Sequence, residues 1–105
     1  MAHSILEFGE KHLIMRDVDL LEALTCMKQE LESHPDENLT FLAEFLQSDM
    51  IHVSGGLDPD LNTHLDSHES REAFVRVIRS IHHKGTEHTE EKILDNLKKL
   101  QALVG

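Results

Sequence analysis

Two stretches of this chain space their apolar residues at intervals of four, three and four, the pattern of one face of an α-helix. Because a helical turn takes 3.6 residues, each set forms a narrow stripe that must be buried against other elements. The two sets are Leu20, Leu24, Met27 and Leu31, and Ile93, Leu97, Leu100 and Val104. This periodicity constrains the chain to packed helices. The second stripe suits the core of one chain and also pairing with a symmetry mate.

The N-terminal segment is also predicted to be helical. Ser4 followed by Glu7 fits a capping box, in which both side chains satisfy free N–H groups at a helix start. We therefore expect a short helix over about 5–15. Gly9 lies inside this segment and disfavours a helix by about 1 kcal/mol relative to alanine.

A second helix is predicted from its boundary residues. Asp17 is a suitable N-cap for a helix near 18–33. The dipeptide His34-Pro35 ends this helix, because the residue before proline is driven out of helical geometry.

A third helix is predicted from Asp36 or Glu37 to Ser48. Its apolar residues cover more than half of its circumference, so we expect it at the centre of the bundle. Residues 50–53 precede the breaker at 54–56 and can form a short extended segment. Such a segment would find a strand partner only across a dimer.

A further helical region begins at Asp58-Pro59, since Asp suits the N-cap and Pro the first helical position. Two interpretations of the following residues stay open. Either one helix runs from Pro59 to His83, or it breaks near Leu65 and Asp66 caps a new helix.

The C-terminal region is predicted to hold one more helix. Lys84-Gly85 supplies a stop, with glycine at the usual C-terminal cap. The last helix then begins at Thr86 or Thr89 and ends at about Val104.

The length of 105 residues is that of one domain, and an apolar content of 39% is adequate for one core. We therefore predict an all-α fold over residues 1–105. It is a small single-domain bundle of four to six short helices, with the option of one short extended segment near 50–53.

The formal charge of −10 resides entirely in residues 1–60, because residues 61–105 carry as many bases as acids. Such asymmetry favours docking on a basic protein surface or between two copies of the chain. We expect a non-enzymatic protein–protein interaction module, a small acidic adaptor, regulator or inhibitor that self-associates. Acids around the His34-Pro35 turn and bases on the outer face of 71–84 form the predicted surface. Its residues are Glu30, Glu32, Asp36, Glu37, Arg71, Arg76 and Arg79.

Nine histidines suggest a second hypothesis. His64, His68 and Glu72 are spaced by four residues, so on a continuous helix they project from one face and can share a divalent metal. The alternative function is therefore a metal-binding or metal-responsive helical protein. The cluster His82-His83 with His88 is better suited to capping, because a helix C-terminus favours protonated histidine.

No motif predicts catalysis or a cofactor. Cys26, the only cysteine, lies among apolar residues of a predicted helix and is expected to be a packing residue. Gly55-Gly56 lacks the Lys-Ser/Thr that follows in a phosphate-binding loop. We expect no enzymatic activity.

Charge and composition also disfavour two partner classes. A net charge of −10 opposes binding to nucleic acid and to anionic membranes, and the chain has no Trp or Tyr to stack bases. Apolar runs are only a few residues long, far below the ~20 residues that cross a membrane. With a single cysteine and no secretory signal pattern, we expect a cytoplasmic protein.

Overall fold

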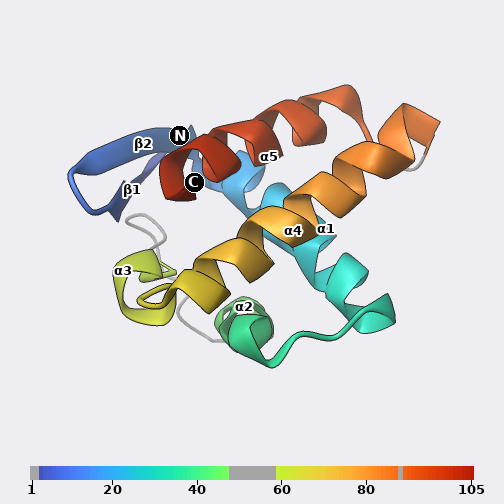
Figure 1. Ribbon diagram of the computed structural model, residues 1–105. Coiled ribbons are helices and arrows are strands. Elements are labelled where there is room, and N and C mark those ends of the chain that lie inside the picture. The colour runs from blue at the N-terminus through green and yellow to red at the C-terminus, as the bar shows by residue number, and fades with distance from the viewer. Residues whose placement is uncertain (1–2, 48–58, 88) are drawn as a thin grey trace.

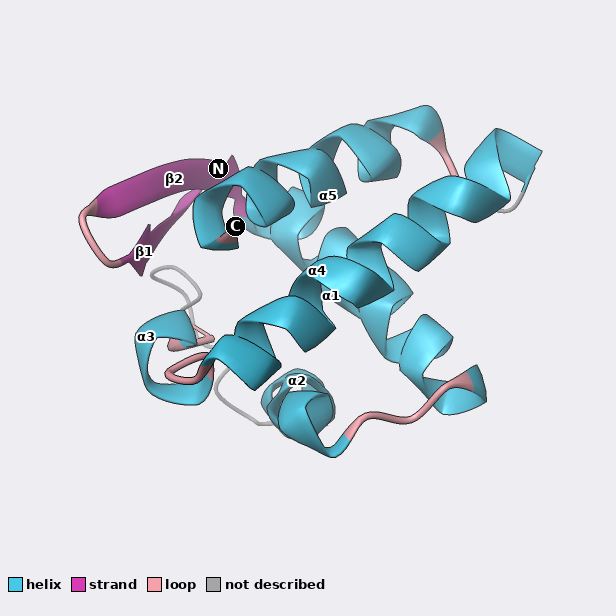
Figure 2. Ribbon diagram, in the orientation of Figure 1, coloured by secondary structure: helices cyan, strands magenta, loops and turns pink. Residues whose placement is uncertain are grey.

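The computed structural model describes residues 3–47, 59–87 and 89–105, and it is mostly helical with one two-stranded antiparallel sheet (Figures 1 and 2). The predicted all-α class is therefore right for the helices and wrong for the first segment. The elements in chain order are β1 (His3–Phe8), β2 (Lys11–Arg16), α1 (Asp17–Ser33), the 3₁₀ turn η1 (Glu37–Leu39), α2 (Thr40–Gln47), α3 (Leu61–His64), α4 (His68–Lys84), the 3₁₀ turn η3 (Gly85–Glu87) and α5 (Glu91–Val104). The expected extended segment at 50–53 and the N-cap at Asp58 lie outside the described residues.

A β-hairpin stands where a helix over 5–15 was predicted. Its two strands pair residue by residue up to the two-residue turn Gly9-Glu10. Gly9 has a φ of 61°, while Glu10 does not adopt a positive φ. Glycine with positive φ at the first central position is typical of a type II′ turn, which matches the twist of the two strands. The residue that disfavours a helix is therefore the one that the hairpin requires.

Ser4 is a strand residue and not a helix cap. It is buried in β1, and its hydroxyl donates a hydrogen bond to the carboxylate of Asp17 at the start of α1. Arg16 holds the N-cap position of α1 without a side-chain hydrogen bond to the helix. The predicted capping box is therefore wrong, because Ser4 faces inward and Glu7 outward along the same strand. The end of α1 before His34-Pro35 is confirmed.

The helix is interrupted between α3 and α4, which decides between the two interpretations of 59–83. α3 is a single turn that ends at His64, and α4 begins at His68. The cap of α4 is Ser67 rather than Asp66. The Ser67 hydroxyl accepts a hydrogen bond from the backbone N–H of Ser70, and the Ser70 hydroxyl accepts one from that of Ser67.

The predicted stop at the end of α4 is confirmed. The helix ends at Lys84, and Gly85 follows with a φ of 72°, a conformation that glycine adopts readily. The start of the last helix is later than expected. α5 begins at Glu91, so neither Thr86 nor Thr89 caps it.

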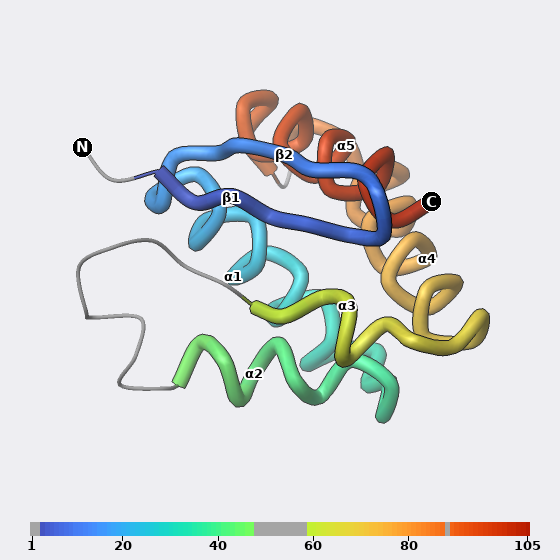
Figure 3. Tube along the Cα trace, turned by 90° about the vertical axis from the view of Figure 1, so that its left-hand side faces the viewer, coloured from blue at the N-terminus to red at the C-terminus, as the bar shows by residue number. Residues whose placement is uncertain are grey.

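The predicted third helix is divided into η1 and α2. The Asp36 side chain accepts a hydrogen bond from the backbone N–H of Asn38 and so caps η1. α2 buries Phe41 and Leu42 but leaves Phe45 only half-buried. It lies at one end of the molecule rather than at its centre, as the two perpendicular views show (Figures 1 and 3).

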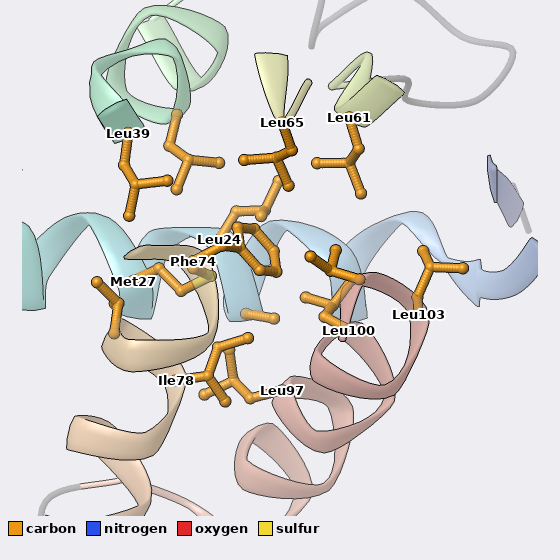
Figure 4. Close-up of a cluster of buried hydrophobic side chains, with 14 of the residues drawn as sticks. Leu24, Met27, Leu39, Leu61, Leu65, Phe74, Ile78, Leu97, Leu100 and Leu103 are labelled. Carbon is orange, nitrogen blue, oxygen red and sulfur yellow. The ribbon is translucent and has the colours of Figure 1, made fainter. Parts of the chain in front are cut away.

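The centre of the fold is formed instead by α1, α4 and α5. Side chains from all three converge there, and Leu61 and Leu65 close one side of the cluster (Figure 4). Leu97, Leu100 and Val104 of the C-terminal stripe are buried in this core. That stripe therefore packs within one chain and is not free to pair with a symmetry mate. Among the described residues, no helix has the length and apolar character needed to span a membrane.

The hairpin covers one side of this helical core (Figure 3). Leu6 of β1 and Met15 of β2 are buried on its inner face, and both strands contact α1 and α5. This packing is what stabilises the hairpin, because a two-stranded sheet alone is marginal in water.

Candidate functional site

The candidate site lies on α4, which divides its surface sharply. Phe74, Val77 and Ile78 point into the core. Arg76 and Arg79 are exposed on the opposite side, and Arg71 is partly exposed beside them. The amphipathic pattern of α4 therefore places Arg76 and Arg79 on the outer surface, with Arg71 at its border with the buried face.

Two adjoining depressions run between this surface and the C-terminal half of α5. Their volumes are about 530 and 590 Å³, and both are lined by Val75, Arg79 and Gly105. The first is also lined by His68, Arg71, Glu72, Arg76 and Val104. The second is also lined by His82, Lys98, Gln101 and Ala102. We refer to these depressions together as the α4–α5 groove.

The α4–α5 groove is basic, although the chain as a whole is acidic. Its lining includes Arg71, Arg76, Arg79 and Lys98, against Glu72 as the one acidic side chain. Within the described residues, no carboxylate lies at ion-pair distance from Arg71, Arg79 or Lys98. In the described part of the chain, no ion pair neutralises these three charges.

Several polar side chains that line the groove interact with groups of the chain itself. Glu72 Oε1 lies 2.8 Å from His68 Nε2, and both side chains are exposed. Arg76 forms a long ion pair with Asp36, at 3.8 Å. A guanidinium N–H of Arg71 donates to the carbonyl of Leu65 at 3.4 Å, which leaves most of its donors free.

The wall of the groove is held by His82. One ring nitrogen, Nδ1, lies 3.0 Å from the carbonyl oxygen of Ile78 in α4, and the other, Nε2, lies 2.9 Å from that of Leu94 in α5. The imidazole therefore bridges the two helices. These contacts are not with the last carbonyls of α4, so they do not test the predicted capping role. His83 is exposed, and His88 lies outside the described residues.

Glu30, which the sequence placed on an interaction surface, is buried. Lys84 Nζ lies 2.6 Å from its Oε2, and the Ser80 hydroxyl donates to its Oε1 at 3.1 Å. The hydrogen bond from Lys84 lowers the pKa of the Glu30 carboxyl, and that from Ser80 adds to the effect. The position explains this burial, since Glu30 follows Met27 by three residues on the apolar stripe of α1.

The other predicted acids lie near the same turn. Asp36 is half-buried and faces Arg76, while Glu32 and Glu37 are exposed. With Asp36 and Glu30 both engaged, part of the acid–base pairing that was expected between two copies occurs within one chain. Glu30 and Asp36 border a separate cavity of about 370 Å³, which His34 and Ser80 also line.

The predicted metal ligands do not come together. The interruption after α3 separates His64 from the other two predicted ligands. Its ring stacks on Phe41, with ring centroids 4.4 Å apart. His68 and Glu72 remain in contact on the first turns of α4. In the described part of the chain, no three His, Cys, Asp or Glu side chains are arranged to hold a metal ion.

Some residues of the site were not predicted from the sequence. Lys98 and Gln101 line the groove from α5, and only the packing of α5 against α4 brings them there.

Cys26 is half-buried, with Sγ 3.9 Å from the Thr89 hydroxyl oxygen. Burial raises the pKa of its thiol, which fits the packing role expected for it.

Comparison with known proteins gives no further assignment. No protein-family model matches the chain, and no curated protein or solved structure matches it significantly.

Proposed function

We propose that this chain is a non-enzymatic protein–protein interaction module whose α4–α5 groove binds an acidic segment of a partner protein. The observation that carries the proposal is a set of cations around a groove in an acidic chain that have no carboxylate partner among the described residues, Arg71, Arg79 and Lys98. The sequence had suggested that acids dock on a basic partner. The burial of Glu30 and the pairing of Asp36 favour the opposite polarity.

The arrangement of the cations suits carboxylates. Arginine presents a planar fork of donors that binds a carboxylate through two parallel hydrogen bonds. Arg71 and Arg79 are eight residues apart on α4, which is roughly 12 Å along a helix axis. An extended peptide of about four residues covers that distance. Two carboxylates separated by two or three residues can therefore meet both arginines.

The floor of the groove supports a peptide rather than a polyanion without side chains. Val75 is half-buried there, and Val104 lies beside it. An apolar side chain between two acids has a surface to contact. A long nucleic acid is disfavoured by the net charge of −10, and no Phe, Trp or Tyr lines the groove to stack its bases.

The proposal is tested with a fluorescein-labelled peptide of alternating Glu and Leu, titrated with the protein and followed by anisotropy. We expect binding at low salt that weakens as salt is raised, because exposed charges are screened. The Arg79→Gln variant should bind about tenfold more weakly, since a charge-assisted hydrogen bond contributes about 1.5 kcal/mol.

The matched control is Lys99→Gln, because Lys99 is exposed on α5 but does not line the groove. It removes the same charge and should leave the affinity almost unchanged. Equal losses of affinity in both variants would mean that net charge alone causes the effect. An affinity that changes neither with salt nor in Arg79→Gln would contradict the proposal.

A further inference from the structure

The outer face of the hairpin carries two of the three most exposed large apolar side chains in the described part of the chain. Ile5 and Ile14 are each 59% exposed and Val18 is 50% exposed, and they are the large apolar residues at this level of exposure in the described chain. Ile5 and Ile14 are direct partners in the register of the two strands. Together they form one continuous apolar pair, and Val18 follows at the start of α1.

Charged pairs flank this apolar pair on the same face. Glu7 is opposite His12 on the side of the turn, and His3 is opposite Arg16 on the other side. Arg16 is already engaged by Asp19, whose two carboxylate oxygens accept from it at 3.0 and 3.1 Å. The face is therefore apolar at its centre and close to balanced in charge, unlike the chain as a whole.

We propose that this face packs against the same face of a second copy of the chain. A two-fold axis parallel to the strands places each strand over the other strand of the second copy. Ile5 then meets Ile14 of that copy, and Glu7 meets its His12. The symmetry repeats both contacts, so the apolar pair meets itself and each Glu7 faces a histidine. His3 then faces Arg16 of the second copy, whose guanidinium is already paired with Asp19.

Pairing through a strand edge fits less well. Asn62 of α3 occupies the β1 edge, because its side chain accepts from the Gly9 N–H at 2.9 Å and donates to the Glu7 carbonyl at 3.3 Å. The outer face, in contrast, leaves Ile5 and Ile14 exposed.

The size of the face sets the expected strength. Six residues in each strand span roughly 20 Å, and the contact is only two strands wide. Such an interface stays below the ~1,200 Å² that stable complexes bury. We therefore expect a weak, reversible dimer, with a dissociation constant on the order of 10–100 μM.

Sedimentation velocity of the full chain from about 5 to 500 μM tests the proposal. We expect a concentration-dependent dimer that persists in 0.5 M salt, because its centre is apolar. Ile14→Thr keeps a β-branched residue in the strand and should raise the dissociation constant tenfold or more. Far-UV circular dichroism checks that the variant is folded.

Charge variants locate the contact. Glu7→Lys should weaken the dimer because it removes the carboxylate that faces His12, and combining it with His12→Glu should restore an opposite-charge contact. Glu87→Lys is the control, since Glu87 is exposed in η3, at the opposite end of α4 from the hairpin (Figure 1). A monomer at all concentrations overturns the proposal, and so does a dimer that Arg79→Gln abolishes while folded Ile14→Thr leaves it intact. Neither result depends on peptide binding in the groove.

Discussion

The two sides of α4 use basic residues in different ways. On the side that faces α1, Lys84 lies 2.6 Å from the buried carboxylate of Glu30. On the outer side, Arg79 has no carboxylate partner among the described residues, and neither has Lys98, which faces it from α5. Arg76 is intermediate, because it lines the groove and also reaches Asp36 at 3.8 Å. In this chain, a basic side chain therefore stabilises the fold where a carboxylate of the same chain lies within ion-pair distance, and is left for other contacts where none does.

Burial explains why the inner pair is needed. Glu30 occupies the buried face of α1, where its side chain is only 4% exposed. A carboxylate without water must be paired and hydrogen-bonded to remain charged, and Lys84 and Ser80 meet that need. A cation on the outer side is hydrated and has no such constraint, so it can be kept for a ligand.

The largest effect is expected from Lys84→Met. The substitution keeps the length of the side chain but leaves the Glu30 carboxylate buried without its cation. We expect the free energy of unfolding to fall by about 2–3 kcal/mol. Urea denaturation should show a lower midpoint with an unchanged slope. Adding Glu30→Leu should recover part of the loss, and a loss below about 0.5 kcal/mol in the single variant would refute the structural role of this pair.

A smaller effect is expected in the pH dependence of the same pair. Lys84 lowers the pKa of Glu30 below its ordinary value of 4.5. Stability from a lowered pKa is present above that value and is lost as pH falls through the folded-state pKa. The stability difference between the native chain and Lys84→Met should therefore shrink below about pH 4.5.

Denaturation at a series of pH values from 7 to 3 measures that difference. Asp19, whose pKa the hydrogen bond from Arg16 lowers to about 2, titrates in both proteins and cancels. A difference that stays constant down to pH 3 would show that Lys84 acts by packing and not by charge.

The elements that the sequence predicts well are those specified by local signals. The stripes of α1 and α5, the stop at Gly85 and the outer face of α4 all depend on spacing within one helix. The hairpin was missed because Ser4 and Glu7 mimic a helix start, while Gly9 was counted as a cost to that helix. Apolar residues on both faces of the strands, such as Ile5 beside Leu6, also hide the alternation.

The site was predicted in part, for the same reason. Arg76 and Arg79 lie on one face of a single helix, so their grouping was visible, and Arg71 is at the edge of that face. The contribution of Lys98 depends on the packing of α5 against α4, which no local pattern encodes. His64 was grouped with His68 only on the assumption of a continuous helix, and Ser67 breaks it. The burial of Glu30 had a signal, its position three residues after Met27, which the charge of the residue obscured.

The smallest effect on stability is expected from Arg79→Gln, and it sharpens the comparison most. Because Arg79 is exposed and makes no ion pair among the described residues, the free energy of unfolding should change by less than about 0.5 kcal/mol. Peptide affinity should fall about tenfold in the same variant. Lys84→Met should behave in the opposite way, with lower stability and nearly unchanged affinity while folded. Urea denaturation and anisotropy on both variants give these four values. If Arg79→Gln destabilised the chain as much as Lys84→Met, the outer cations would hold the fold together and would not be reserved for a ligand.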